Sequence, residues 1–163
     1  MMSQMKWKLM SAGVLAACTC GVAWQFAWAT PGSGVTAVVL TGLPVLLDEI
    51  DVKSGGEDHH VSLKTKGLTD AHFVHYTIVP GGTTGWHSHP GIALATVKSG
   101  TLTLYEADDP LTPQPYPAGT AFTEEDGHVH LARNEGSTDV ELIVLHLVPV
   151  GAPRRIDEPA PAP

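Results

Sequence analysis

The stretch GGTTGWHSHPGIALATVKSG, residues 81–100, contains the pattern that decides the fold. It places His87 and His89 two residues apart, after a glycine-rich turn and before a run of β-type residues. Because side chains alternate between the two faces of a strand, both imidazoles would point to the same side. The stretch GTAFTEEDGHVHLARN, residues 119–134, repeats this arrangement with His128 and His130. Two such pairs predict a site for a divalent metal ion, since neutral imidazole is a common metal ligand.

The sequence on both sides of these stretches consists of short β-type runs separated by turn residues. Several runs alternate apolar and polar residues, as in Thr101–Tyr105, which predicts strands with one buried face. Many short strands between glycine- and proline-rich turns are typical of an all-β sandwich or a closed barrel. The predicted strands are residues 35–40, 45–52, 60–66, 72–79, 92–98, 101–107, 120–123, 128–132 and 140–148.

Two segments have an unusual composition. Val140–Val148 is almost wholly apolar, which predicts a strand that is buried on both faces. Asp108–Pro117 contains four prolines and is predicted to be an irregular excursion between two strands. The turn at Pro80-Gly81-Gly82 is predicted to separate two strands.

Residues 70 to 150 resemble the cupin superfamily, and the first stretch carries half of this resemblance. The first family motif is a Gly, five residues, His-x-His, three or four residues, Glu, six residues and Gly. The chain keeps this spacing with Gly81, His87, His89 and Gly100. Ala93 stands where the family has its glutamate.

The second stretch carries the other half of the resemblance. The second family motif is a Gly, five residues, Pro-x-Gly, two residues, His, three residues and Asn. Gly119, Gly127, His130 and Asn134 keep the spacing, and Glu125 replaces the proline. The resemblance implies a single all-β domain, a cupin-type jelly-roll β-barrel, over residues 35–150.

The resemblance also implies a metal ion inside the barrel, on His87, His89 and His130. It does not supply the fourth ligand, because Ala93 has no ligand atom. Three alternatives remain open: three histidines with water, His128 as a fourth ligand, or a site that has lost its metal. Glu124 belongs to a run of three acidic residues that is interpreted as a solvated turn, although Glu124 could also approach the metal from the barrel rim.

The expected cofactor is one divalent transition metal, namely Fe, Zn, Ni, Mn or Cu. Three neutral imidazoles leave its two positive charges uncompensated, which favours an anionic or enolate-like ligand. We therefore expect a metal-dependent oxygenase or isomerase that acts on a small anionic molecule. The alternative is a cupin that binds a small ligand without turnover. The sequence does not identify a general base. A homodimer is expected by analogy with the family.

Residues 1–29 have the features of a cleavable signal peptide. Lys6 and Lys8 precede an apolar run, Leu9–Trp24, and Ala27-Trp28-Ala29 has the form cut by signal peptidase. The expected location is therefore periplasmic or secreted. A membrane anchor is one alternative, and a lipoprotein anchored through Cys18 is another.

The chain of 163 residues is long enough for one domain. Its two cysteines lie within the expected signal peptide, so the mature protein would fold without a disulfide. Without Lys6 and Lys8, seven basic residues face 17 acidic ones, a net charge of −10. Such a chain repels phosphate backbones, which argues against nucleic acid as a partner. Residues 30–34 are predicted to be a flexible lead-in, and the Pro/Ala-rich tail, residues 151–163, is predicted to be loosely ordered.

Overall fold

A computed structural model describes residues 29–41 and 43–162. The predicted signal peptide, with Cys18, lies outside the described residues except for Ala29. The described residues contain no helix, and therefore none that is long and apolar enough to cross a membrane.

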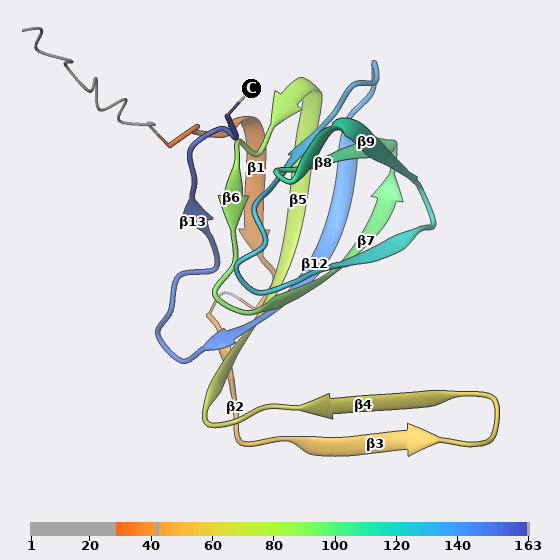
Figure 1. Ribbon diagram of the computed structural model, residues 1–163, viewed down its shortest axis with the longest axis vertical. Helices are drawn as coiled ribbons and strands as arrows, with labels where there is room; N and C mark the ends of the chain where they lie inside the picture. Colours follow the sequence, from red (N-terminus) through yellow and green to blue (C-terminus); the bar gives the residue numbers. More distant parts are fainter. Residues whose placement is uncertain (1–28, 42, 163) are drawn as a thin grey trace, which may run out of the picture.

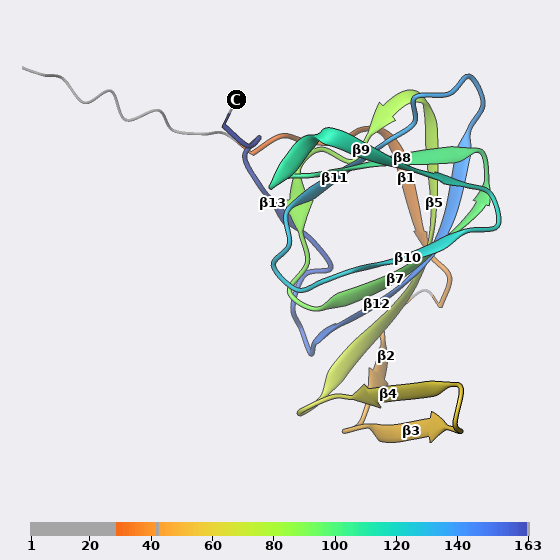
Figure 2. The ribbon, with the colours of Figure 1, turned by 45° about the vertical axis from the view of Figure 1, so that its right-hand side comes forward.

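The described chain is all-β, and the predicted jelly-roll barrel is confirmed (Figure 1). Its strands curl into a nearly closed barrel that is seen end-on in Figure 2. The strands are β1 (Ser33–Val39), β2 (Val45–Leu47), β3 (Asp51–Gly55), β4 (His60–Lys64), β5 (Thr69–Thr83), β6 (His87–Ser88), β7 (Ile92–Ser99), β8 (Thr101–Glu106), β9 (Asp109–Pro117), β10 (Ala121–Glu124), β11 (His130–Arg133), β12 (Val140–Pro149) and β13 (Ile156–Asp157).

The strand pairings divide the barrel into two sheets. In the first sheet β12 lies between β5 and β7, while β10 pairs with β7 and β1 pairs with β5. In the second sheet β11 pairs with β6 and β8, β9 pairs with β8, and β13 pairs with β6. The two sheets are joined where Thr83 of the long strand β5 pairs with Arg133 of β11.

Alternation along the strands fills the barrel with apolar side chains. In β7 the inward residues are Ala93, Ala95 and Val97, all about 1% exposed, and the residues between them are exposed. Their small size leaves room inside the barrel beside the larger Leu102 and Phe122. β12 is buried on one face only, which corrects the prediction of two buried faces for Val140–Val148.

Two further segments differ from their sequence predictions. The proline-rich segment forms strand β9, because it lies at a sheet edge and pairs only with β8 among the described strands. An edge strand needs backbone donors on one side only, so its prolines are tolerated. β5 runs through the predicted turn at Pro80–Gly82, where Gly81 adopts a φ of 74° and its N–H donates to the carbonyl of Asn134.

The β3–β4 hairpin and the C-terminal tail have contrasting surroundings. Strands β3 and β4 pair with each other as a hairpin that projects away from the barrel (Figures 1 and 2). The tail was predicted to be loosely ordered, but it turns back along the barrel and forms β13 against β6. Its side chains also reach the wall, since Ser88 donates a hydrogen bond to Glu158.

Candidate metal centre

Three histidines converge inside the barrel at the end where the second sheet begins. His87 lies on β6, His89 directly follows that strand, and His130 begins β11. His87 and His130 are paired across the two strands, so their side chains share a face. One ring nitrogen from each of the three lies within 4.8 Å of the others, and all three residues are buried. The structure therefore brings together the three residues that the motifs indicate.

Each of these imidazoles is oriented by a backbone carbonyl. The Nδ1 atoms of His87, His89 and His130 lie 2.9, 2.6 and 3.0 Å from the carbonyl oxygens of Gly85, Arg154 and His128. A carbonyl can only accept, so each Nδ1 carries the proton and each Nε2 presents its lone pair. The buried Nε2 atoms of His89 and His130 have no hydrogen-bond partner among the described residues. Metal-ligating histidines have this arrangement: one ring nitrogen is free to bind the metal, and the other donates its hydrogen to a carbonyl or carboxylate.

Gly85 makes the approach to this cluster possible. Its φ of 70° lies in the left-handed region, which favours glycine. A Cβ at this position would lie 2.0 Å from the carbonyl oxygen of Thr30. The turn thus aims the Gly85 carbonyl at His87 and lets the chain pass close to the start of the domain.

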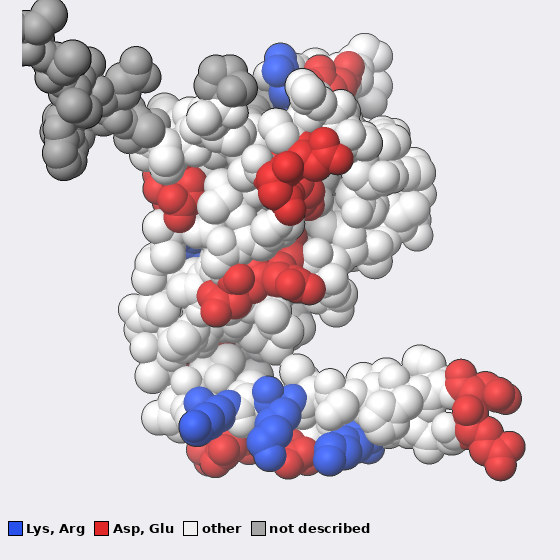
Figure 3. All heavy atoms as spheres, viewed as in Figure 1, with Lys and Arg blue, Asp and Glu red and all other residues white. Residues whose placement is uncertain are grey.

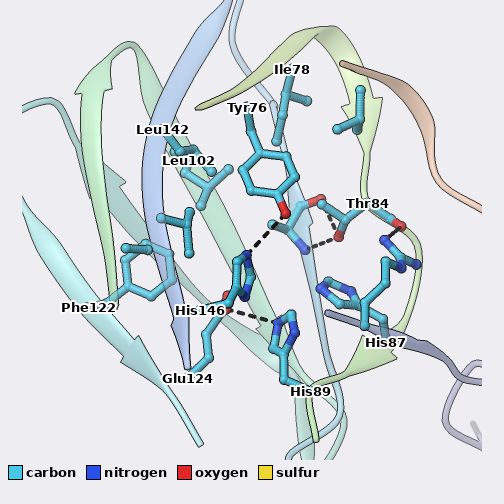
Figure 4. Close-up of a pocket in the computed structure, with 15 residues that line it drawn as sticks. Tyr76, Ile78, Thr84, His87, His89, Leu102, Phe122, Glu124, Leu142 and His146 are labelled. Carbon is cyan, nitrogen blue, oxygen red and sulfur yellow. Dashed lines mark hydrogen bonds and ion pairs between the residues drawn. The ribbon is translucent and has the colours of Figure 1, made fainter. Parts of the chain in front are cut away.

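Glu124 brings a carboxylate to the cluster. Its Oε2 lies 3.0 Å from Nε2 of His89 (Figure 4), and its Oε1 lies 3.2 Å from Nε2 of His130. Neither contact has the alignment of a hydrogen bond, as expected when both groups face a common point. Glu124 sits directly opposite Ala93 on β10 and β7, so it enters the barrel beside the place where the family glutamate would stand. Among the alternatives left open by the sequence, this position of Glu124 corresponds to its approach to the metal cluster from the barrel rim.

The electrostatics of the cluster match these contacts. Burial alone would raise the pKa of Glu124, but the imidazoles of His130 and His89 hold it well below its ordinary value. Burial lowers the pKa of His130, but the Glu124 carboxylate more than offsets this and the net pKa is raised. The pKa of His87 falls to about 3, through burial and the nearby positive charge of His130 and Arg155. The site therefore holds an ionised carboxylate and a His87 ring that is neutral at ordinary pH.

His128 lies outside this cluster. Its side chain is 44% exposed, and its ring nitrogens lie 3.3 Å from Glu106 and 3.6 Å from Asp108. The residue occupies a turn in which its N–H donates to the carbonyl of Glu125. Because β11 begins only at His130, the two-residue periodicity of a strand does not apply to this pair.

The histidine cluster opens into a small cavity of about 60 Å³. One water needs roughly 10–15 Å³ by this measure, so the space suits a molecule of few non-hydrogen atoms. Figure 4 shows apolar residues such as Phe122 and Leu142 on its walls. It also shows His146 and Tyr76, whose side chains point into it and lie 3.1 Å apart.

The sequence motifs include neither His146 nor Tyr76, which the structure places beside the cavity. His146 lies on β12 opposite His72 of β5, and its ring centre is 5.0 Å from that of His89. Tyr76 lies four residues further along β5, on the same inward face. The alternation of β5 and β12 predicts an inward face, but the sequence does not say which strands adjoin the histidine motif.

Comparisons with known proteins agree with this architecture. The family model described as "Cupin domain" matches residues 74–146. No match was found among the curated proteins.

The structure is similar to several solved structures at low sequence identity, and one of the three that follow has a TM-score above 0.5. The polyketide cyclase RemF from Streptomyces resistomycificus has a TM-score of 0.53 and 14% identity over 78% of this chain and 75% of its own. A cupin superfamily protein from Desulfitobacterium hafniense has a TM-score of 0.47 and 10% identity over 71% and 78%. An oxalate oxidase in complex with the substrate analogue glycolate has a TM-score of 0.46 and 22% identity over 53% and 45%, so this chain matches less than half of that protein.

Proposed function

We propose that this chain, whose residues 74–146 match the cupin domain family, is a metal-dependent oxygenase or isomerase for a small anionic molecule. The proposed metal ligands are His87, His89, His130 and Glu124. The cofactor is one divalent transition metal of the group Fe, Zn, Ni, Mn and Cu. When bound, such an ion supplies a Lewis acid or a binding position for oxygen.

The observation that carries this proposal is the common orientation of the three imidazoles. Each Nδ1 faces a backbone carbonyl, and the nitrogens that would coordinate the metal lie within 4.8 Å of one another in a buried site. Burying three imidazoles and a carboxylate at one point is costly unless a cation sits among them. Glu124 brings a carboxylate to the cluster, as the missing glutamate of the motif would have done. This supports the proposal that the carboxylate ligand comes from position 124 in place of position 93.

The charge of the site supports a small anion as the substrate. One carboxylate compensates half of a divalent ion's charge, so the centre keeps a net positive charge. The cavity is small and its walls are largely apolar, which strengthens electrostatic attraction inside it. The protein's role is then to hold the ion, to exclude water and to orient the bound molecule.

The setting of this activity is also proposed. Export to the periplasm or the exterior rests on the composition of residues 1–29. Figure 3 shows acidic side chains across the visible face of the barrel, whereas most of the visible basic ones lie, together with further acidic ones, on and beside the β3–β4 hairpin, which contains Lys53 and Lys64. An acidic barrel fits a soluble small-molecule partner rather than nucleic acid. A homodimer remains the expectation by analogy.

Metal content tests the proposal. The chain from residue 30 is loaded with each candidate ion, and the bound metal is measured by elemental analysis. We expect one ion per chain, its loss in His87→Ala and His130→Ala, and its retention in the matched control His128→Ala. Retention of the metal by His130→Ala would contradict the proposed ligand set.

Oxygen uptake and turnover then distinguish the kinds of activity. Stoichiometric iron with oxygen consumption in the presence of small carboxylates would support the oxygenase. Stoichiometric metal with ligand binding and no turnover would instead identify a binding protein.

A further inference from the structure

A row of three polar side chains leads from the C-terminal tail to the metal cluster. Nη1 of Arg154 lies 3.4 Å from the hydroxyl oxygen of Tyr76, and this oxygen lies 3.1 Å from Nε2 of His146. The His146 ring adjoins that of His89, with 5.0 Å between the ring centres. No step of the proposed metal binding uses these three side chains.

The donors in this row fix the tautomer of His146. Arg154 can only donate, so the Tyr76 oxygen accepts from it. Among the described residues, Nε2 of His146 is the acceptor that remains for the Tyr76 hydroxyl hydrogen. Nε2 is then unprotonated, and Nδ1 carries the hydrogen of the neutral ring.

The Nδ1–H of His146 is consequently a buried donor without an acceptor. His146 is 3% exposed, and its Nδ1 has no hydrogen-bond partner in the part of the chain that the structure describes. An unsatisfied buried donor destabilises a protein by about 1–3 kcal/mol, so such groups usually serve a bound molecule. His146 lines the cavity beside Glu124 and His89 (Figure 4), where a molecule at the metal would also lie.

Arg154 adds a positive charge at the other end of the row. Its side chain is half-buried and forms no ion pair with a described carboxylate, whereas Arg133 and Arg155 pair with Glu135 and Asp157. A guanidinium without a counter-ion near a small cavity favours an anionic occupant.

We propose that His146 is a specificity-determining residue whose Nδ1–H donates to the carboxylate of a small substrate, with Arg154 supplying long-range charge and Tyr76 holding the tautomer. This deepens the proposed function by naming a carboxylate as the substrate's anionic group. The donor and the charge belong to the protein itself, so discrimination of carboxylates does not need the metal.

Paired probes and paired variants test this site. Acetate and the neutral, equally sized acetamide are titrated by NMR into the metal-free and the zinc-loaded protein. Wild type should bind acetate at least about tenfold more tightly than acetamide, since hydrogen bonds to charged groups contribute about 1.5–3 kcal/mol. His146→Asn keeps a donor near the position of Nδ1, whereas His146→Gln places its amide near Nε2. The Asn variant should retain most of the preference, and the Gln variant should lose it.

A second pair of variants does not touch the cavity wall. Arg154→Gln should reduce the preference for acetate several-fold and leave its backbone carbonyl on His89. The matched control, Arg133→Gln, removes an equal charge that is already paired and should leave the preference unchanged. Equal binding of acetate and acetamide by the metal-free wild type, or equal losses in the Asn and Gln variants, would overturn the proposal.

Zinc content separates this test from that of the proposed function. Zinc binding without any preference for acetate refutes the role of His146 and leaves the metal centre standing. A preference for acetate in a protein that takes up neither zinc nor any of the other candidate ions supports the role of His146 and refutes the metal centre.

Discussion

Glu124, the proposed fourth ligand, and Ala93 lie directly opposite each other on β10 and β7. Side chains of paired residues point to the same face with their Cβ atoms about 4.5–5.5 Å apart. A carboxylate can therefore reach one point inside the barrel from either position. Ala93 is 1% exposed and its small side chain leaves the space that the Glu124 side chain uses.

A carboxylate swap tests this equivalence. Glu124→Ala should weaken zinc binding by at least about 10–100-fold, the range that loss of an outer-shell partner already causes. The double variant Glu124→Ala with Ala93→Glu should recover most of the affinity, because the carboxylate returns from the paired position. The measurement is competition with a chelating dye, with Glu125→Gln as the exposed control. Failure of the double variant to recover while it remains folded would show that the two positions are not equivalent.

Metal uptake should depend on pH through His130. In the metal-free protein Glu124 raises the pKa of His130 above its ordinary 6.5, so this ring holds its proton to a higher pH than a free imidazole does. A metal ligand must be a neutral imidazole, so the ion has to displace that proton. His87, with its pKa near 3, is already neutral and contributes no proton.

We therefore expect metal affinity to fall as the pH falls through the pKa of His130, and the number of protons released per ion to rise in the same direction. Calorimetry in two buffers of different ionisation enthalpy measures this number. In Glu124→Gln the cause of the raised pKa is gone, so fewer protons should leave at the same pH. Proton release that is independent of pH between 5 and 8 would contradict this assignment.

The three histidines were predicted from the sequence motifs, whereas Glu124 could be raised only as one alternative. His87, His89 and His130 belong to spaced motifs, so their convergence follows from the fold that the motifs imply. The position of Glu124 depends on the register between β10 and β7, and a one-residue slip would turn it outward. His128 shows the converse, because its spacing suggested a shared face but its backbone is in a turn.

At the scale of elements, the tail does more for the site than its composition suggests. The carbonyl of Arg154 accepts from His89, and β13 pairs with the two-residue strand β6 that carries His87. The sequence does not predict β13, which is surrounded by prolines and alanines. A short edge strand needs few backbone donors and no long alternation of apolar and polar residues. Strands β7, β8 and β12, in contrast, show a clear pattern of apolar residues, and their bounds were predicted to within two residues.

Truncation after Gly151 should therefore damage the metal centre as well as the wall. We expect zinc affinity to fall roughly 10–100-fold, because His89 loses the acceptor behind it. Thermal unfolding should also shift to lower temperature, since β6 loses one of its two partners. Dye competition and circular dichroism measure the two effects.

The hairpin provides the control for this truncation. β3 and β4 pair with each other alone among the described strands, so replacing residues 51–64 by a short Gly/Ser linker should leave zinc affinity unchanged. A truncated tail that keeps full zinc affinity would show that the Arg154 carbonyl does not orient His89.

At the scale of the whole molecule, the proposed ion would join the two sheets of the barrel. Glu124 comes from β10 in the first sheet, whereas His87 and His130 come from β6 and β11 in the second. In the described chain the backbone pairing between these sheets lies at the end of β5, where Thr83 pairs with Arg133 and where Gly81 and Gly82 exchange hydrogen bonds with Asn134. An ion shared by both sheets would add a further link between them.

Chelation should consequently lower the stability of the entire barrel. A ligand at 1,000 times its dissociation constant stabilises the folded state by about 4 kcal/mol, which corresponds to a shift in Tm on the order of 10 °C for a domain of this size. Scanning calorimetry with and without EDTA measures the shift, and a single transition is expected in both cases because the sheets share one core. His130→Ala should show no shift on addition of EDTA, since Glu124 and the remaining imidazoles cannot hold the ion tightly. An equal shift in that variant would mean that the stabilising ion binds elsewhere, and the link between the sheets would then have to come from the protein chain alone.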